Sequence, residues 1–128
     1  MTEKATQFID HVHLRVAHFD KARTFYLALF DALGRSDQAD SGRDWLELDG
    51  FYLDQADVDA PPSRIHLAFR ARSRAEVHAF HKAGLQAGGT DNGAPGLRPD
   101  YDAHYYGAFV RDPDGNKVHV VHRGDLPA

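Results

Sequence analysis

Apolar and polar residues alternate from position 8 to position 16, a pattern typical of a β-strand with one buried face. The apolar residues between Val12 and Val16 share one face, and the residues between them are polar. Further along, apolar residues from Ala22 to Leu33 recur three or four positions apart, as on one side of an amphipathic helix. Gly34 follows directly and predicts the end of that helix. The first third of the chain therefore predicts a strand followed by a helix.

The same pattern returns in the second half of the chain. The segment His66–Ala71 aligns with His11–Val16, and a second run of helical spacing follows it. Ser73 and Glu76 predict a capping box at the start of this helix, in which each side chain bonds to the other residue's free amide. Gly88-Gly89 predicts its end. The chain therefore contains an internal repeat with a histidine at the same place in each copy.

Short strands are expected after each helix, separated by turn residues. Asp49-Gly50 and residues 112–115 predict two tight turns, because proline and glycine suit the dihedral angles of such turns. Residues 60–63, with two consecutive prolines, predict a linker between the two halves. Residues 94–104 predict an extra loop that the first half lacks. The expected strands are residues 44–48, 51–54, 105–111 and 117–122.

This order of elements predicts an α+β fold made of two tandem βαβββ modules. Module one spans about residues 7–59 and module two about residues 64–123. A chain of 128 residues has the length of one compact domain with its own core. We therefore expect a single domain over residues 1–128.

Composition narrows the classes of function. The chain has no cysteine, which excludes disulfide scaffolds, thiolate metal sites and cysteine nucleophiles. Its formal net charge is −4 and its Lys and Arg residues are not clustered, so we expect no nucleic-acid partner. We find neither an apolar run long enough for a membrane span nor a secretory signal, and expect a cytoplasmic protein without a membrane partner. Nine histidines point to metal or acid–base chemistry.

Four segments together resemble a known family. They are Asp10–Val12, Phe25-Tyr26, Arg64–Phe69 and Tyr105–Asn116, and they occur in the right order through nearly the whole chain. The sequence resembles the vicinal oxygen chelate superfamily, which includes glyoxalase I, extradiol dioxygenases and the bleomycin- and fosfomycin-resistance proteins. The resemblance implies that the two modules form a cup-shaped mixed sheet, the glyoxalase/bleomycin resistance/dioxygenase fold. It also implies a homodimer in which each site draws on both chains.

The resemblance implies a metal ion in the cup. The family's ligand positions correspond to His11, His66 and His119, and His119 stands where the family usually has Glu. Three imidazoles still suit a divalent ion, and we expect Zn, Ni, Co or Fe(II). Asp54 is the counterpart of His119 in module one and is a candidate fourth ligand.

Strand alternation adds candidates on the same face as His11. His13 is the candidate general base or substrate contact, with a buried structural histidine as the alternative. Arg15 should also face the cup. The extra loop and the following strand supply further candidates for substrate binding, although at least one of the two adjacent tyrosines should pack in the sheet because neighbours face opposite ways. These candidates are Arg98, Tyr101, His104, Tyr105 and Tyr106.

Two functions follow from the resemblance. The first is a metal-dependent, glyoxalase-like enzyme that chelates two neighbouring oxygens of a small substrate and stabilises an enediolate or related oxyanion. The second is a metal-free protein of the bleomycin-resistance type, which sequesters a small ligand without transforming it. The net charge of −4 favours a cationic ligand in that case, and His119 in place of Glu fits a loss of catalysis.

Overall fold

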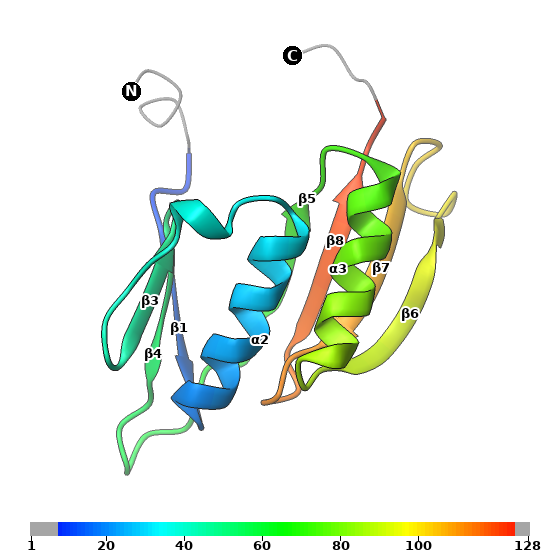
Figure 1. The fold of residues 1–128 in the computed structure, drawn as a ribbon. Helices are drawn as coiled ribbons and strands as arrows, with labels where there is room; N and C mark the ends of the chain where they lie inside the picture. Colours follow the sequence, from blue (N-terminus) through cyan, green and yellow to red (C-terminus); the bar gives the residue numbers. More distant parts are fainter. Residues whose placement is uncertain (1–7, 125–128) are drawn as a thin grey trace.

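The structure is a computed structural model that describes residues 8–124, and it consists of two βαβββ modules (Figure 1). Module one contains β1 (Val12–Val16), α2 (Phe19–Ala32), a 3₁₀ turn η1 (Ser36–Gln38), β2 (Asp40–Ser41), β3 (Trp45–Leu48) and β4 (Phe51–Gln55). Module two contains β5 (His66–Arg70), α3 (Arg74–Gln86), β6 (Thr90–Leu97), β7 (Tyr106–Arg111) and β8 (Lys117–His122). The predicted α+β class and the tandem modules are confirmed.

Each module folds its own mixed sheet. Sheet one has the strand order β1-β4-β3-β2, and sheet two has the equivalent order β5-β8-β7-β6. In both, the first strand of the module pairs in parallel with the last, and the remaining pairs are antiparallel. Within residues 8–124, no strand of one sheet pairs with a strand of the other. None of the helices in this part of the chain is long and apolar enough to span a membrane.

The two helices lie side by side on the same side of the sheets and contact each other (Figure 1). Leu14 and Val16 of β1 are buried against this layer, whereas His13 and Arg15 lie on the opposite face. Three phenylalanines join the modules: Phe30 of α2, Phe51 of β4 and Phe69 of β5. Their ring centroids lie 5.7–5.8 Å apart, within the range of favourable aromatic pairs. One hydrophobic core thus extends across both modules.

The turn between β7 and β8 is organised by a buried carboxylate. Asp112 is 4% exposed and accepts hydrogen bonds from the amides of Asp114 and Asn116, at 2.9 and 2.8 Å. It also accepts from the Asn116 side chain at 3.1 Å and from the hydroxyl of Tyr26 on α2 at 2.7 Å. Burial, and then the neighbouring Asp112 carboxylate, raise the pKa of Tyr26 far above its usual value, so its hydroxyl stays protonated and donates.

The same turn reaches two further points of the fold. The Asp114 carboxylate accepts a 2.8 Å bond from the amide of Ala17, between β1 and α2. The Asn116 side chain accepts a 2.8 Å bond from the amide of Ile65, just before β5. A motif that the sequence identifies only as a hairpin turn therefore also fastens module one to module two.

Two local predictions are corrected. Residues 94–97 belong to β6, so the extra loop begins at Arg98 rather than at residue 94. The pairing of β6 with β7 contains register shifts around Gly93, which form a bulge in the strand. The glycine-rich sequence of this bulged strand resembles that of a loop. The capping box is also only half formed, because Ser73 accepts from the Glu76 amide at 3.1 Å. The Glu76 carboxylate accepts instead from the amide of Arg72 at 2.7 Å.

Candidate functional site

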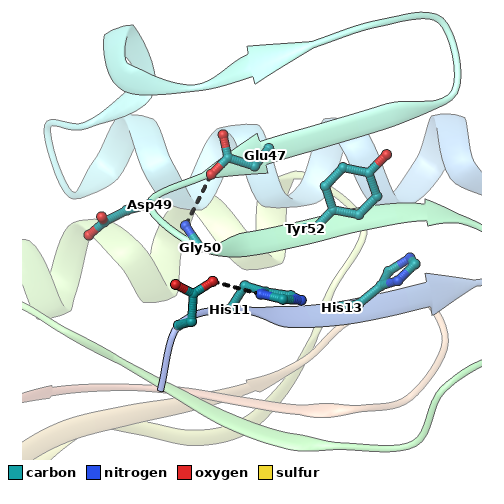
Figure 2. Close-up of a pocket in the computed structure, with 7 residues that line it drawn as sticks. His11, His13, Glu47, Asp49, Gly50 and Tyr52 are labelled. Atoms are coloured by element: carbon teal, nitrogen blue, oxygen red, sulfur yellow. Dashed lines mark hydrogen bonds and ion pairs between the residues drawn. The ribbon is translucent and has the colours of Figure 1, made fainter. Parts of the chain in front are cut away.

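The faces of the two sheets that point away from the helices carry the predicted residues His13, Arg15, Asp54, His66 and His119, and we call them the open faces. On sheet one, a cleft of about 440 Å³ lies beside the start of β1 and the β3–β4 turn (Figure 2). Glu47 and Tyr52 project over it from paired positions on β3 and β4, opposite two histidines of β1 and its approach. The cleft is lined by Asp10, His11, His13, Glu47, Asp49, Gly50 and Tyr52.

His11 lies at the exposed rim of this cleft, one residue before β1. Its Nδ1 is 2.8 Å from the Asp10 carboxylate (Figure 2). The adjacent turn is fixed by Gly50, whose amide donates to Glu47 at 3.0 Å and whose carbonyl accepts from Val12 at 2.7 Å. His11 is therefore presented outward from a defined backbone position, with its imidazole 66% exposed.

Asp54, a predicted metal ligand, is instead engaged by the two polar residues of β1. Its carboxylate lies 2.8 Å from His13 Nε2 and accepts a 3.2 Å bond from Arg15 Nε. The parallel register explains this pairing, because β4 places Asp54 opposite Arg15 and Tyr52 opposite His13. The Tyr52 ring packs edge-on against the His13 imidazole at 4.9 Å. The chain thus forms a His–Asp pair in which the imidazole is held at one nitrogen.

The open face of sheet two brings the other two predicted ligands together. His66 Nε2 lies 2.9 Å from His119 Nδ1, and the ring centroids are 4.1 Å apart. His119 is 7% exposed, and its Nε2 is buried without a hydrogen-bond partner in the described part of the chain. Burial, followed by the charges of His66, Lys117 and Arg98, lowers the pKa of His119 to about 4. At neutral pH this imidazole is therefore uncharged, the form that binds metals.

His119 predicts a dependence of stability on pH. The folded protein holds its pKa at about 4, below the ordinary 6.5, so in this window the unfolded chain binds a proton that the folded protein does not. The free energy of unfolding should therefore fall as the pH drops from 6.5 to 4, by roughly 1–3 kcal/mol from this residue. Urea unfolding of the wild type and of His119→Gln, both with chelator, measures the difference. Parallel pH profiles of the two proteins contradict the prediction.

Phe109 separates His119 from Arg98. The register places Phe109 of β7 beside His119 of β8 on one side and Gly93 of β6 on the other. Its ring stacks on the His119 imidazole at 3.9 Å, and the Arg98 guanidinium lies 4.7 Å from the same ring. A side chain at Gly93 would clash, since a Cβ there would lie 2.7 Å from the Phe109 ring. The glycine bulge thus leaves room for this stack.

The loop after Arg98 carries two tyrosines that pack together beside Phe109. Tyr101 is 61% exposed and packs against Tyr105, at 4.9 Å between centroids. Tyr105 is buried and lies under the guanidinium of Arg123, which is ion-paired with Asp102.

The two remaining candidates of this region lie apart from the His66–His119 pair. His104 is exposed, and its amide donates to the Asp102 side chain at 2.7 Å. Tyr106 lies on the helix side of β7, where its hydroxyl is 2.6 Å from His78 of α3. Of the adjacent pair Tyr105 and Tyr106, Tyr106 is the tyrosine that packs in the sheet.

The predicted metal ligands fall into three separate places. They are His11 beside Asp10, Asp54 beside His13, and the pair of His66 and His119. No group of three or more His, Asp or Glu side chains within residues 8–124 is arranged to hold one metal ion. The described residues of one chain therefore bring together only two of the predicted ligands, His66 and His119.

Sequence reasoning missed three residues of the open faces. Glu47 and Tyr52 line the cleft of sheet one, and Phe109 stacks on His119. Strand alternation contained the signal for Tyr52, because it lies two residues before Asp54 on the same predicted strand. Glu47 and Phe109 follow only from the pairing of their strands with β4 and β8.

Comparison with known proteins agrees with the fold. The family profile described as "Glyoxalase/Bleomycin resistance protein/Dioxygenase superfamily" matches residues 8–120. The chain belongs to this superfamily. No curated protein has a sequence that matches it.

Solved structures share the fold. A glyoxalase/bleomycin resistance protein from Albidiferax ferrireducens T118 is 29% identical, with a TM-score of 0.77 over 91% of this chain and 100% of that one. A glyoxalase-related enzyme from Fulvimarina pelagi is 22% identical, with a TM-score of 0.70 over 94% and 91%. A lactoylglutathione lyase from Agrobacterium tumefaciens is 20% identical, with a TM-score of 0.60 over 89% and 92%. The last two similarities concern the fold alone.

Proposed function

We propose that this protein is a metal-dependent, glyoxalase-like enzyme that acts as a homodimer on a small substrate with two neighbouring oxygens. The observation that carries the proposal is the pair of His66 and His119 on the open face of sheet two. Their facing nitrogens are 2.9 Å apart, close to the roughly 3.3 Å between two nitrogens bound to one tetrahedral zinc ion. His119 is neutral, and its Nδ1 is the nitrogen that faces His66, whereas its Nε2 is buried without a partner in the described part of the chain. In this proposal, His11 of a second copy supplies the third ligand.

Opposite charges on the cleft of sheet one and on the open face of sheet two support the pairing of two copies. The cleft of sheet one is lined by three carboxylates and by no Lys or Arg. The open-face positions of β5, β7 and β8 carry basic and neutral residues and no Asp or Glu. Sheet one of one copy therefore attracts sheet two of another, and a twofold axis repeats the contact. The basic residues are His66, Arg70, Arg111 and Lys117.

A divalent ion such as Zn, Ni, Co or Fe(II), held by three imidazoles, would supply Lewis-acid polarisation of the substrate oxygens. The chain's own contribution to proton transfer is His13. Its Nε2 is held by Asp54, so in the neutral imidazole Nδ1 is left to accept a proton from the substrate. Arg15 fixes the Asp54 carboxylate and so orients the ring through it. His13 is 43% exposed, which leaves it open to substrate.

The test is the metal content of untagged protein purified without chelator, beside His66→Ala and a matched control. We expect about one ion per chain in the wild type and less than about a tenth of that in His66→Ala, because only one imidazole of the pair remains. The control is His18→Ala, since His18 is exposed and its side chain makes no capping bond. Plasma mass spectrometry gives the amount and the identity of the metal. Absence of metal, with no uptake of added Zn, Ni, Co or Fe(II), contradicts the proposal and favours a metal-free ligand-binding protein.

A further inference from the structure

The charged groups around the His66–His119 pair are basic. The charged groups that act on His119 are His66, Lys117 and Arg98, and all three are basic. The nearby acidic side chain of Asp102 is ion-paired with Arg123. A bound metal ion would add further positive charge. That charge would stay uncompensated, because no carboxylate lies among the open-face positions of β5, β7 and β8. Such a site has a strong preference for a negatively charged ligand.

Arg98 has the geometry of an anion-binding residue. Its guanidinium donates to the carbonyls of Ala94 at 2.6 Å and Leu97 at 3.4 Å, and its face rests on Phe109. A guanidinium has five N–H donors, so three of them remain after these two bonds. The group is half-buried and is fixed by the bonds and the ring, which lowers the entropy lost when it binds a planar anion.

The stack connects this cation to the candidate metal ligands. Arg98, Phe109 and His119 form three successive layers, so an anion on Arg98 lies within one aromatic ring of His119. The exposed ring of Tyr101 packs at 6.4 Å from Phe109 and offers a flat apolar surface beside the guanidinium. The cleft of sheet one, in contrast, is lined by the carboxylates of Asp10, Glu47 and Asp49, the last of which is ion-paired with Arg35.

We infer that the substrate carries a carboxylate separated from its two neighbouring oxygens by about the thickness of one aromatic ring, and that Arg98 binds this carboxylate and determines specificity for it. The inference rests on the proposed function only for the location of the reacting oxygens. The carboxylate-binding step uses Arg98 and requires no metal. Arg98 is therefore a specificity residue, and Lys117 adds attraction at longer range.

The test uses phenylglyoxylate, which combines a carboxylate, a neighbouring carbonyl and a flat ring, and its uncharged methyl ester. Calorimetric titration of full-length protein in the presence of chelator measures both affinities without any metal. We expect phenylglyoxylate to bind roughly 10-fold to 100-fold more tightly than the ester, because charge-assisted hydrogen bonds are lost in the ester. Arg98→Gln should reduce the affinity for phenylglyoxylate by a similar factor and leave the affinity for the ester unchanged.

Three variants make the result specific. Arg98→Lys keeps the charge but not the planar fork and should recover only part of the affinity. Lys117→Gln, at an exposed position, should weaken phenylglyoxylate binding about 2-fold to 5-fold. Arg43→Gln, exposed in module one, is the matched control and should bind like the wild type.

Several results overturn the inference. These are equal affinities for acid and ester, no binding of the acid, or full affinity in Arg98→Gln. If Arg98→Gln fails to fold, as judged by circular dichroism, the Arg98→Lys and Lys117→Gln titrations decide. Because metal content is measured separately, loss of anion binding and loss of the metal site are distinguishable outcomes.

Discussion

Refolding a mixture of His11→Ala and His66→Ala chains is expected to restore metal binding that neither variant has alone. If each site takes His11 from one copy and His66 from the other, a mixed dimer contains one site with both substitutions and one intact site. Random pairing makes half of the dimers mixed, so about one quarter of all sites should bind metal. Each variant refolded alone should bind less than about a tenth of the wild-type amount. Metal per chain after refolding and gel filtration measures the recovery.

The control for this experiment measures whether chains exchange between dimers during refolding. Two wild-type proteins with different affinity tags, refolded together, must form dimers that carry both tags. If chains exchange but the mixed variants bind no more metal than either variant alone, the ligands are not shared between copies. A mixture that recovers the metal content without any dimer in sedimentation contradicts the proposal equally.

Asp112→Ala is expected to lower the free energy of unfolding by about 3 kcal/mol, the largest effect on stability that we predict for a single polar residue. The carboxylate is buried and accepts four hydrogen bonds, from the Tyr26 hydroxyl, the amides of Asp114 and Asn116, and the Asn116 side chain. Removing it leaves these donors unsatisfied in a buried place, which costs more than the loss of the bonds alone. Urea unfolding followed by circular dichroism measures the change.

Asp59→Ala is the matched control, because Asp59 is exposed just before the linker and its loss should change the stability by less than about 0.5 kcal/mol. Tyr26→Phe removes only the longest-range of the Asp112 bonds and should cost about 1 kcal/mol. A loss in Asp112→Ala no greater than that in Tyr26→Phe would show that the bonds within the turn contribute little.

The sequence predicted the fold well because the relevant signals are local and repeated. Alternation in β1 and helical spacing in α2 both report which residues are buried, and each appears twice along the chain. The bounds of β8 agree with the predicted residues 117–122, since a turn with Pro113 and Gly115 fixes where that strand begins. β6 was missed because its glycines and Pro95 have the composition of a loop.

For the candidate site, the sequence predicted on which face of a strand each residue lies, but not which residues contact one another. Alternation correctly placed His13 and Arg15 on the polar face of β1. That Asp54 pairs with both depends on the register between β1 and β4, which alternation does not determine. The layers around Phe109 likewise depend on which strands neighbour β7, and this pairing joins residues far apart in the chain.

The separation of the two sheets has a consequence for the order of folding. Among residues 8–124, all strand pairing occurs inside one module, so each module can form its strand hydrogen bonds without the other. The contacts between modules are side-chain contacts of high sequence separation, such as the bond from Tyr26 to Asp112, 86 positions along the chain. Closing such long loops costs entropy before the contact repays it, so docking should follow the formation of the modules. Substitutions at the docking contacts should then accelerate unfolding while leaving the refolding rate nearly unchanged.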